Sequence, residues 1–282
     1  MIIDFHAHTF PPKISLKALE SLSKNGHVKY TADGTVDSLI EMMSHSGVKY
    51  SVNLPVMTRA DQVSQVNDSL LRTKDKLFSM GIVTFGGLHP AFEDYKQEIR
   101  RLKEAGIKGI KLHPAFQGVH INDIAYKRII AEISAQGMIA ITHSGLDVGF
   151  LNENYATVPE LLDLIDDVHP EKLVLAHMGG WQAWDEVQRD LAGAPVWLDT
   201  AFSLGPVQIR PGDEDVMLYH SNMSRQNFVS LVRKHGADKV LFATDSPWER
   251  QEDYLAFIKG CDLSEKEKQL VLGENAAALL NI

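Results

Sequence analysis

The stretch LKEAGIKGIKLH, residues 102–113, joins an amphipathic segment to an apolar run through Gly106. Glycine suits the left-handed position just past the end of a helix, and a nearby Lys or His suits the negative end of the helix dipole. Three other stretches repeat this pattern, at Gly47, Gly137 and Gly236. We interpret each of them as a helix, a capping glycine and a strand.

The spacing of these glycines indicates a repeated βα unit. Successive gaps are 59, 31 and 99 residues, near two, one and three times a unit of about 30 residues. Eight apolar runs recur along the chain in keeping with this unit. They are residues 2–8, 49–56, 81–90, 106–114, 138–145, 172–180, 195–202 and 239–247. Because the runs are continuous, they are typical of parallel strands covered on both faces.

The fold predicted from these runs is α/β, a (β/α)₈ TIM barrel formed by residues 1–282 as a single domain. The length of 282 residues is close to the roughly 250 typical of this barrel. An open, doubly wound parallel sheet is the alternative.

Composition narrows the class of partner. The net charge is −9 and the sequence has no run of Lys or Arg. We therefore expect that the protein binds neither nucleic acid nor an anionic membrane. The N-terminus MIIDFHAHTF lacks the basic region of a signal peptide, and no apolar stretch approaches the length of a membrane span. The single cysteine, Cys261, fits a reducing compartment, so a cytoplasmic location is expected.

Side chains able to act in chemistry fall at or just past the ends of seven of these eight runs. In a parallel barrel the C-terminal strand ends meet on one face, where active sites are built. Residues far apart in the sequence are therefore expected to become neighbours there. They are His6, His8, His89, Lys111, His113, His143, His177, Asp199 and Asp245.

His6 and His8 are the strongest metal-ligand candidates. One residue separates them on an extended segment, so both side chains point to the same side. Imidazole suits Zn²⁺ or a neighbouring first-row metal. His143 and Asp245 can complete the set. A lone pair of histidines is often an ordinary hydrogen-bonded feature, so the inference rests on all four residues together.

Five motifs carry a family resemblance: IIDFHAH (2–8), ITHSG (141–145), LAHMGG (175–180), FATDSPW (242–248) and LGENAAALL (272–280). With them the chain resembles the amidohydrolase superfamily, and within it the amidohydrolase 2 group of TIM-barrel metal-dependent hydrolases and decarboxylases. The resemblance implies one divalent ion, usually zinc, held by His6, His8, His143 and Asp245. It also implies that His177 contacts the metal's water or the substrate.

The fourth run departs from better-defined branches of the superfamily, because Lys111 stands two residues before His113. A carboxylated Lys111 could hold a second metal, as in some superfamily members. The favoured interpretation is that Lys111 or His113 supplies positive charge or a hydrogen bond to an anionic substrate group. In the third, structural interpretation, the sequence KLHP simply ends the strand at Pro114.

The favoured function is a hydrolase that attacks an amide, ester or lactone of a small, anionic molecule with a metal-activated water. Asp245 would accept the proton of this water, while His177 would stabilise charge or relay a proton. The alternative is a non-oxidative decarboxylase of an aromatic or dienoic acid. A barrel that binds metal or ligand without turnover is the third hypothesis.

A substrate carboxylate would need cationic partners, which Lys111, Arg210 and Arg250 could provide. Arg210 lies in a long segment, 203–224, that fits an active-site cover and also contains His220. Trp248 could line an aromatic pocket. A homodimer stays open, because the sequence carries no recognisable interface stripe.

Overall fold

Strands and helices alternate through the part of the chain that the computed structural model describes, residues 1–215 and 223–282. The strands are β1 (Ile3–Ala7), β2 (Tyr50–Asn53), β3 (Ile82–Thr84), β4 (Gly86–Gly87), β5 (Gly109–Leu112), β6 (Ile139–Thr142), β7 (Leu173–Leu175), β8 (Trp197–Asp199) and β9 (Val240–Leu241). The helices are α1 (Ser15–Gly26), α2 (Val36–Ser46), α3 (Val63–Ser79), α4 (Tyr95–Glu104), α5 (Pro114–Gln117), α6 (Ile124–Ala135), α7 (Val158–Val168), α8 (Trp184–Glu186), α9 (Arg225–His235), α10 (Gln251–Lys259), α11 (Glu265–Gln269) and α12 (Asn275–Leu280).

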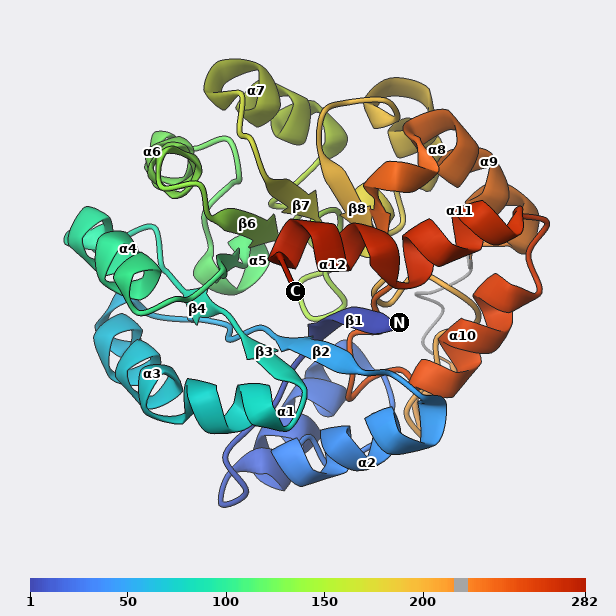
Figure 1. The fold of residues 1–282 in the computed structure, drawn as a ribbon, viewed down its shortest axis with the longest axis horizontal. Coiled ribbons are helices and arrows are strands. Elements are labelled where there is room, and N and C mark those ends of the chain that lie inside the picture. The colour runs from blue at the N-terminus through green and yellow to red at the C-terminus, as the bar shows by residue number, and fades with distance from the viewer. Residues whose placement is uncertain (216–222) are drawn as a thin grey trace.

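The strands form a parallel ring inside a ring of helices (Figure 1). Neighbours pair in the orders β1-β2-β3 and β4-β5-β6-β7-β8-β9, and β3 and β4 are two halves of one predicted run, separated by Phe85. Backbone hydrogen bonds join the first strand to the last, from Phe5 N to Phe242 O (2.8 Å) and from Asp245 N to His6 O (2.9 Å). The predicted TIM barrel is confirmed.

Alternate side chains of each strand fill two different apolar clusters. In β6, Ile139 and Ile141 belong to the cluster that contains Phe5 and Phe85. Ala140 lies between them in sequence and packs in the larger cluster with the helices. This alternation follows from the two-residue period of a strand. Strands buried on both faces explain why the apolar runs are continuous.

The four glycine junctions of the sequence lie where the pattern predicted them. Gly47, Gly106, Gly137 and Gly236 all follow helices, and all have positive φ, from 64° to 108°. The starts of five helices are also determined by nearby residues, because a polar side chain caps each of them. The capping residues are Thr35, Asp123, Thr157, Ser224 and Ser264. Residues at the helix ends therefore determine where helices and strands alternate along the chain.

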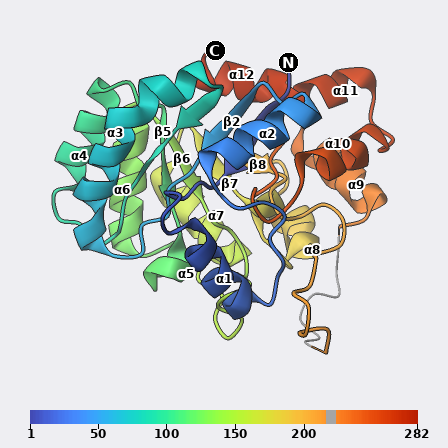
Figure 2. The same ribbon diagram turned by 90° about the horizontal axis from the view of Figure 1, so that it is seen from below.

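Segments at one end of the barrel cover the C-terminal strand ends. In Figure 2, α12 lies beside both termini, and α1 and α5 lie at the opposite end of the barrel. The described part of the long segment, 203–215, pairs with the chain after α1 through an antiparallel bridge between Val28 and Ile209. His220 lies outside the described residues.

Gly145 illustrates how tightly this end is built. It has φ +85°, and a Cβ there would lie 2.1 Å from Trp181 N and 2.5 Å from Gly180 C. Gly137 also has positive φ, but nothing lies within 4 Å of the position that a Cβ would occupy. We expect Gly137→Ala to cost about 1–2 kcal/mol of unfolding free energy, and Gly145→Ala to cost at least ~3 kcal/mol because backbone must also move. Denaturant titration measures both, and equal costs would contradict this account of the packing.

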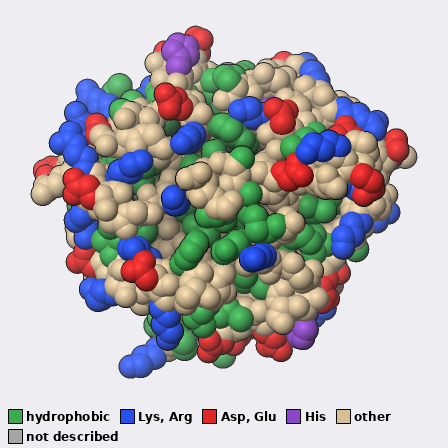
Figure 3. Space-filling view, in the orientation of Figure 1, with side chains coloured by type: hydrophobic (Ala, Val, Ile, Leu, Met, Phe, Trp, Pro, Cys, Tyr) green, Lys and Arg blue, Asp and Glu red, His purple; other side chains and the backbone are tan. Residues whose placement is uncertain are grey.

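None of the helices in the described ranges combines the length and apolarity needed to cross a membrane. On the face seen in Figure 3, Lys and Arg side chains are interspersed with Asp and Glu around the rim. Basic side chains therefore form no single large patch on that face.

Candidate active site

The strand ends place a row of histidines at the C-terminal end of the barrel. Ring centroids are 5.0 Å apart for His6 and His8, 5.5 Å for His6 and His177, and 4.6 Å for His177 and His143. His113 continues the row, with its ring 4.5 Å from that of His143. Residues far apart in the sequence thus share one site, as the strand-end pattern predicted.

Three ligand atoms converge at one end of this row. His6 Nε2 lies 3.2 Å from His8 Nε2 and 3.6 Å from Asp245 Oδ1, and His8 Nε2 lies 3.0 Å from the same Asp245 oxygen. Ligand atoms about 2.0–2.2 Å from a tetrahedrally coordinated ion lie roughly 3.4 Å apart. The spacing of the three atoms matches this value.

Hydrogen bonds to the Nδ1 atoms of His6 and His8 determine whether the two Nε2 atoms carry a proton. His6 Nδ1 lies 2.8 Å from Asp199 Oδ2, and His8 Nδ1 lies 2.7 Å from the carbonyl oxygen of Leu54. Both partners only accept, so each Nδ1 carries the proton and each Nε2 keeps its lone pair. Burial lowers the pKa of His6 well below its usual value, which keeps that ring neutral.

Three acceptors therefore face one another without a proton between them. Asp245 Oδ1 is buried and accepts no hydrogen bond from the described residues, although His8 Nε2 is only 3.0 Å away. A buried acceptor without a donor is costly. A divalent cation resolves this conflict, so these three residues fit a metal ion.

Lys111 brings a positive charge to the same place. Its side chain is only 1% exposed, and Nζ lies 3.2 Å from His6 Nε2. Burial lowers the pKa of Lys111 to about 8, while the carboxylates of Asp199, Asp245 and Asp147 act in the opposite direction. Within residues 1–215 and 223–282, no carboxylate forms a direct ion pair with this ammonium group.

His143 belongs to a second group, with His113 and Asp147. Asp147 Oδ2 lies 3.6 Å from His113 Nε2 and 3.8 Å from His143 Nδ1. All three residues are buried, and burial raises the pKa of Asp147 to about 6. The structure thus gathers His6, His8 and Asp245, and it brings His143 next to them without adding its nitrogens to their group.

Asp147 is a residue that the sequence analysis missed. It lies four residues after His143, in the loop that follows β6. The pattern of strand-end residues excluded it, because it stands beyond the apolar run. An acidic residue shortly after a strand-end histidine is the only signal that pointed to it.

His177 lies in the middle of the row, and one of its ring nitrogens forms a hydrogen bond to the backbone. Its Nδ1 donates to Ala201 O at 2.9 Å, and the residue is 5% exposed. Since Nδ1 carries the proton, Nε2 keeps a lone pair. Burial lowers the pKa of His177, so the ring is a neutral acceptor.

The side chains of Arg210 and Trp248 contact residues outside the row of histidines. Arg210 is engaged by Asp213 and Glu20, with nitrogen–oxygen distances of 3.7 and 3.9 Å. Trp248 packs in a small apolar cluster with Val28 and Trp181. Neither side chain forms a hydrogen bond or ion pair with the row of histidines in the described part of the chain.

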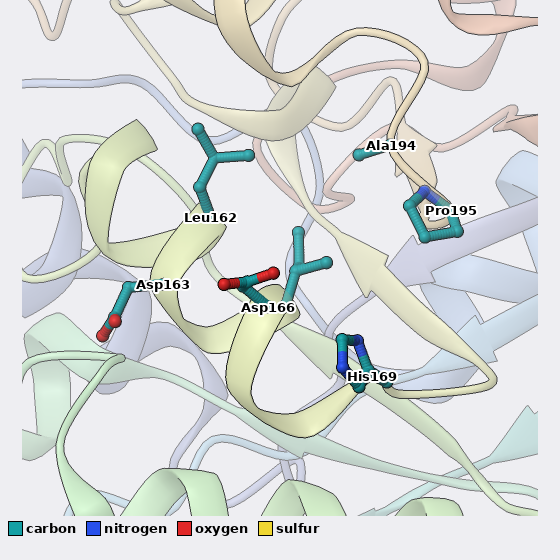
Figure 4. Close-up of a pocket in the computed structure, with 7 residues that line it drawn as sticks. Leu162, Asp163, Asp166, His169, Ala194 and Pro195 are labelled. Carbon is teal, nitrogen blue, oxygen red and sulfur yellow. The ribbon is translucent and has the colours of Figure 1, made fainter.

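A cavity of about 530 Å³ lies elsewhere, beside α7 (Figure 4). Its lining includes Leu162, Asp166 and His169 from α7 and its cap, and Ala194 and Pro195 from the segment before β8. These residues precede the N-terminal ends of β7 and β8. The cavity is thus at the wrong end of the barrel for the strand-end chemistry, and none of the candidate residues lines it.

Comparison with known proteins points to one family and several solved structures. The model of the amidohydrolase family matches residues 3–282. No curated protein matches the chain. The structure of 2,6-dihydroxybenzoate decarboxylase complexed with 2,6-dihydroxybenzoate is similar with a TM-score of 0.72 and 14% sequence identity, over 100% of this chain and 99% of that one.

Two further solved structures cover nearly all of both chains. A dihydroxybenzoic acid decarboxylase from Polaromonas sp. JS666, with bound manganese and the inhibitor 2-nitroresorcinol, has a TM-score of 0.72 and 15% identity, over 99% of this chain and 96% of that one. A probable 2-pyrone-4,6-dicarboxylic acid hydrolase from Acinetobacter baumannii, with citric acid bound, has a TM-score of 0.64 and 16% identity, over 100% and 99%. At these identities the likeness shows a shared fold.

Proposed function

The chain belongs to the amidohydrolase family, and from this premise we propose that it hydrolyses an amide, ester or lactone bond of a small, anionic molecule with a divalent metal ion. The observation that carries the proposal is the convergence of three acceptor atoms, from His6, His8 and Asp245, with no proton to separate them. They lie at the C-terminal end of the barrel, where TIM-barrel enzymes carry out their chemistry.

Four residues are proposed to hold the ion: His6, His8, Asp245 and His143. The first three are supported by their spacing, and His143 by the family resemblance alone. Zinc is the ion that we propose, because imidazole nitrogens and a carboxylate oxygen are typical ligands of catalytic zinc. The similar decarboxylase from Polaromonas has manganese bound. When bound, the ion would lower the pKa of a water towards about 7 and polarise the substrate's carbonyl oxygen.

Asp245 and His177 are proposed to move the proton. Asp245 would accept it from the attacking water and deliver it to the leaving group, so that the water oxygen bonds to the carbonyl carbon as the leaving group departs. His177 offers Nε2 as an acceptor, because its Nδ1 is held by Ala201 O. It would relay this proton or orient the water.

Lys111 and His113 are proposed to bind the anionic part of the substrate. The ammonium group of Lys111 is buried beside His6, where a substrate carboxylate would find a strong, charge-assisted partner. Arg210 and Trp248 are proposed as more distant contacts. A carboxylated Lys111 that holds a second ion stays the less favoured proposal.

Lys111 also favours a second candidate function, the decarboxylation of an aromatic or dienoic acid. A carboxylate held next to a metal site is the group that such an enzyme removes. The two functions differ in their products, because hydrolysis adds water and gives a carboxylate with an alcohol or an amine, whereas decarboxylation releases CO₂.

Product analysis on substrate panels separates these functions. We expect the metal-loaded protein to convert members of a lactone, ester and amide panel to their carboxylate products, and Asp245→Asn to abolish that conversion. A panel of aromatic acids tests for CO₂ in parallel. Release of CO₂ without any hydrolysis would overturn the hydrolase proposal in favour of the decarboxylase.

A further inference from the structure

Asp199 is a fully buried carboxylate at the end of β8, and both of its oxygens are engaged by the candidate site. Oδ2 lies 2.8 Å from His6 Nδ1. Oδ1 accepts hydrogen bonds from the backbone nitrogens of His177 and Ala201, each at 3.0 Å. One side chain thus links the ends of β1, β7 and β8.

We propose that Asp199 is a positioning residue that sets the tautomer of His6 and fixes the backbone of His177. This inference rests on the proposed function, since it treats His6 as a metal ligand and His177 as a proton acceptor. It assigns a role to a strand-end residue that neither the metal site nor the proton transfer uses directly.

Asp199 acts on His6 through the outer nitrogen of its ring. An ionised carboxylate can only accept a hydrogen bond, so Asp199 requires the proton of the ring to be on Nδ1. Nε2 then keeps its lone pair where it faces His8 and Asp245. Carboxylates that hold the outer nitrogen of a ligating histidine in this way orient the ring and raise its basicity.

His8 shows why Asp199 matters particularly for His6. The outer nitrogen of His8 is held by the backbone carbonyl of Leu54, which no substitution of that residue's side chain removes. The outer nitrogen of His6 depends on a side chain. The tautomer of one ligand is therefore fixed by the fold, and that of the other by Asp199.

Asp199 acts on His177 through the backbone. Its φ is +58°, in the left-handed region that residues other than glycine seldom adopt. The contact from its backbone nitrogen to Asp199 Oδ1 holds it there, and its ring is held by the carbonyl of Ala201. Ala201 in turn donates to Asp199 Oδ1, so one carboxylate organises both anchors of His177.

Asp199→Asn separates the tautomer role from a merely structural one. The asparagine has the same shape, and its oxygen can still accept from the backbone nitrogens of His177 and Ala201. Its amide group would donate to His6 Nδ1, which would force the proton onto Nε2. We expect metal affinity to fall about 10–100-fold, while the thermal stability of the metal-free protein changes little.

Two measurements on metal-free and zinc-titrated protein test this. Long-range ¹H–¹⁵N NMR of the metal-free protein should find His6 protonated at Nδ1 in the wild type and at Nε2 in Asp199→Asn. Zinc titration should find the weakened affinity in Asp199→Asn but not in Glu98→Gln, a control at another buried carboxylate. Glu98 lies on α4, where it is engaged by Arg101 of the same helix and by Asn67 of α3.

The outcomes distinguish this inference from the proposed function. Wild-type affinity for zinc in Asp199→Asn, or a wild-type His6 already protonated at Nε2, would overturn the role of Asp199. If the wild type binds no divalent ion, the proposed function fails, whereas the NMR comparison still decides whether Asp199 sets the tautomer. The wild-type spectrum alone decides this point if Asp199→Asn does not fold.

Discussion

Asp245→Ala is expected to yield a folded protein that has lost most of its divalent metal and nearly all of its activity. Asp245 supplies the only negative charge among the three converging ligand atoms, and the two neutral imidazole nitrogens of His6 and His8 hold a cation weakly without it. Loss of the ion removes several kcal/mol of transition-state stabilisation, a rate decrease on the order of 10³-fold or more. Elemental analysis of the purified variant measures the metal content.

Asp253→Ala is the matched control for this substitution. Asp253 is exposed in the first turn of α10, close in sequence to Asp245 but outside the group of ligand atoms. It should keep wild-type metal content. His6→Ala should behave like Asp245→Ala, and full metal occupancy in either of these two variants would show that the ligand assignment is wrong.

His177→Asn is expected to keep the metal and lose activity by about 10²- to 10⁴-fold, the usual contribution of a general acid or base. Asparagine can still donate to the carbonyl of Ala201, as His177 Nδ1 does. It has no basic nitrogen to replace Nε2, so only the proton acceptor is lost. Steady-state kinetics and metal analysis on the same preparation measure the two effects.

The contrast between these variants is itself informative. A His177→Asn protein that loses its metal would make His177 a ligand rather than a proton acceptor. A variant with nearly wild-type turnover and full metal would remove His177 from the mechanism altogether.

The fold could be predicted from the sequence because its signals are local. The glycines at 47, 106, 137 and 236 have the positive φ values that the helix-to-strand junctions required, and all eight apolar runs contain the strands of the barrel. The pairing of the first and last strands then brought His6 next to Asp245, from the opposite end of the sequence. That closure followed from the predicted topology.

The tautomers and ion pairs of the site depend on contacts that the spacing of residues in the sequence does not reveal. The proton on His6 Nδ1 follows from Asp199, 193 residues away, and the pairing of His143 with Asp147 follows from the course of a loop after β6. The ion-pair partners of Arg210 are Glu20 and Asp213, and its expected role at the substrate stays a prediction. Loop conformation determines these contacts, and it carries no periodic signal. The single domain, the cytoplasmic location and the homodimer stay predictions.

Anomalous diffraction at the absorption edge of the bound metal tests the central claim most directly. We expect one strong peak about 2.0–2.3 Å from His6 Nε2, His8 Nε2 and a carboxylate oxygen of Asp245. The same map reveals whether His143 joins them and whether Lys111 holds a second ion. The absence of a peak at these three atoms, or a peak only between His113, His143 and Asp147, would contradict this claim.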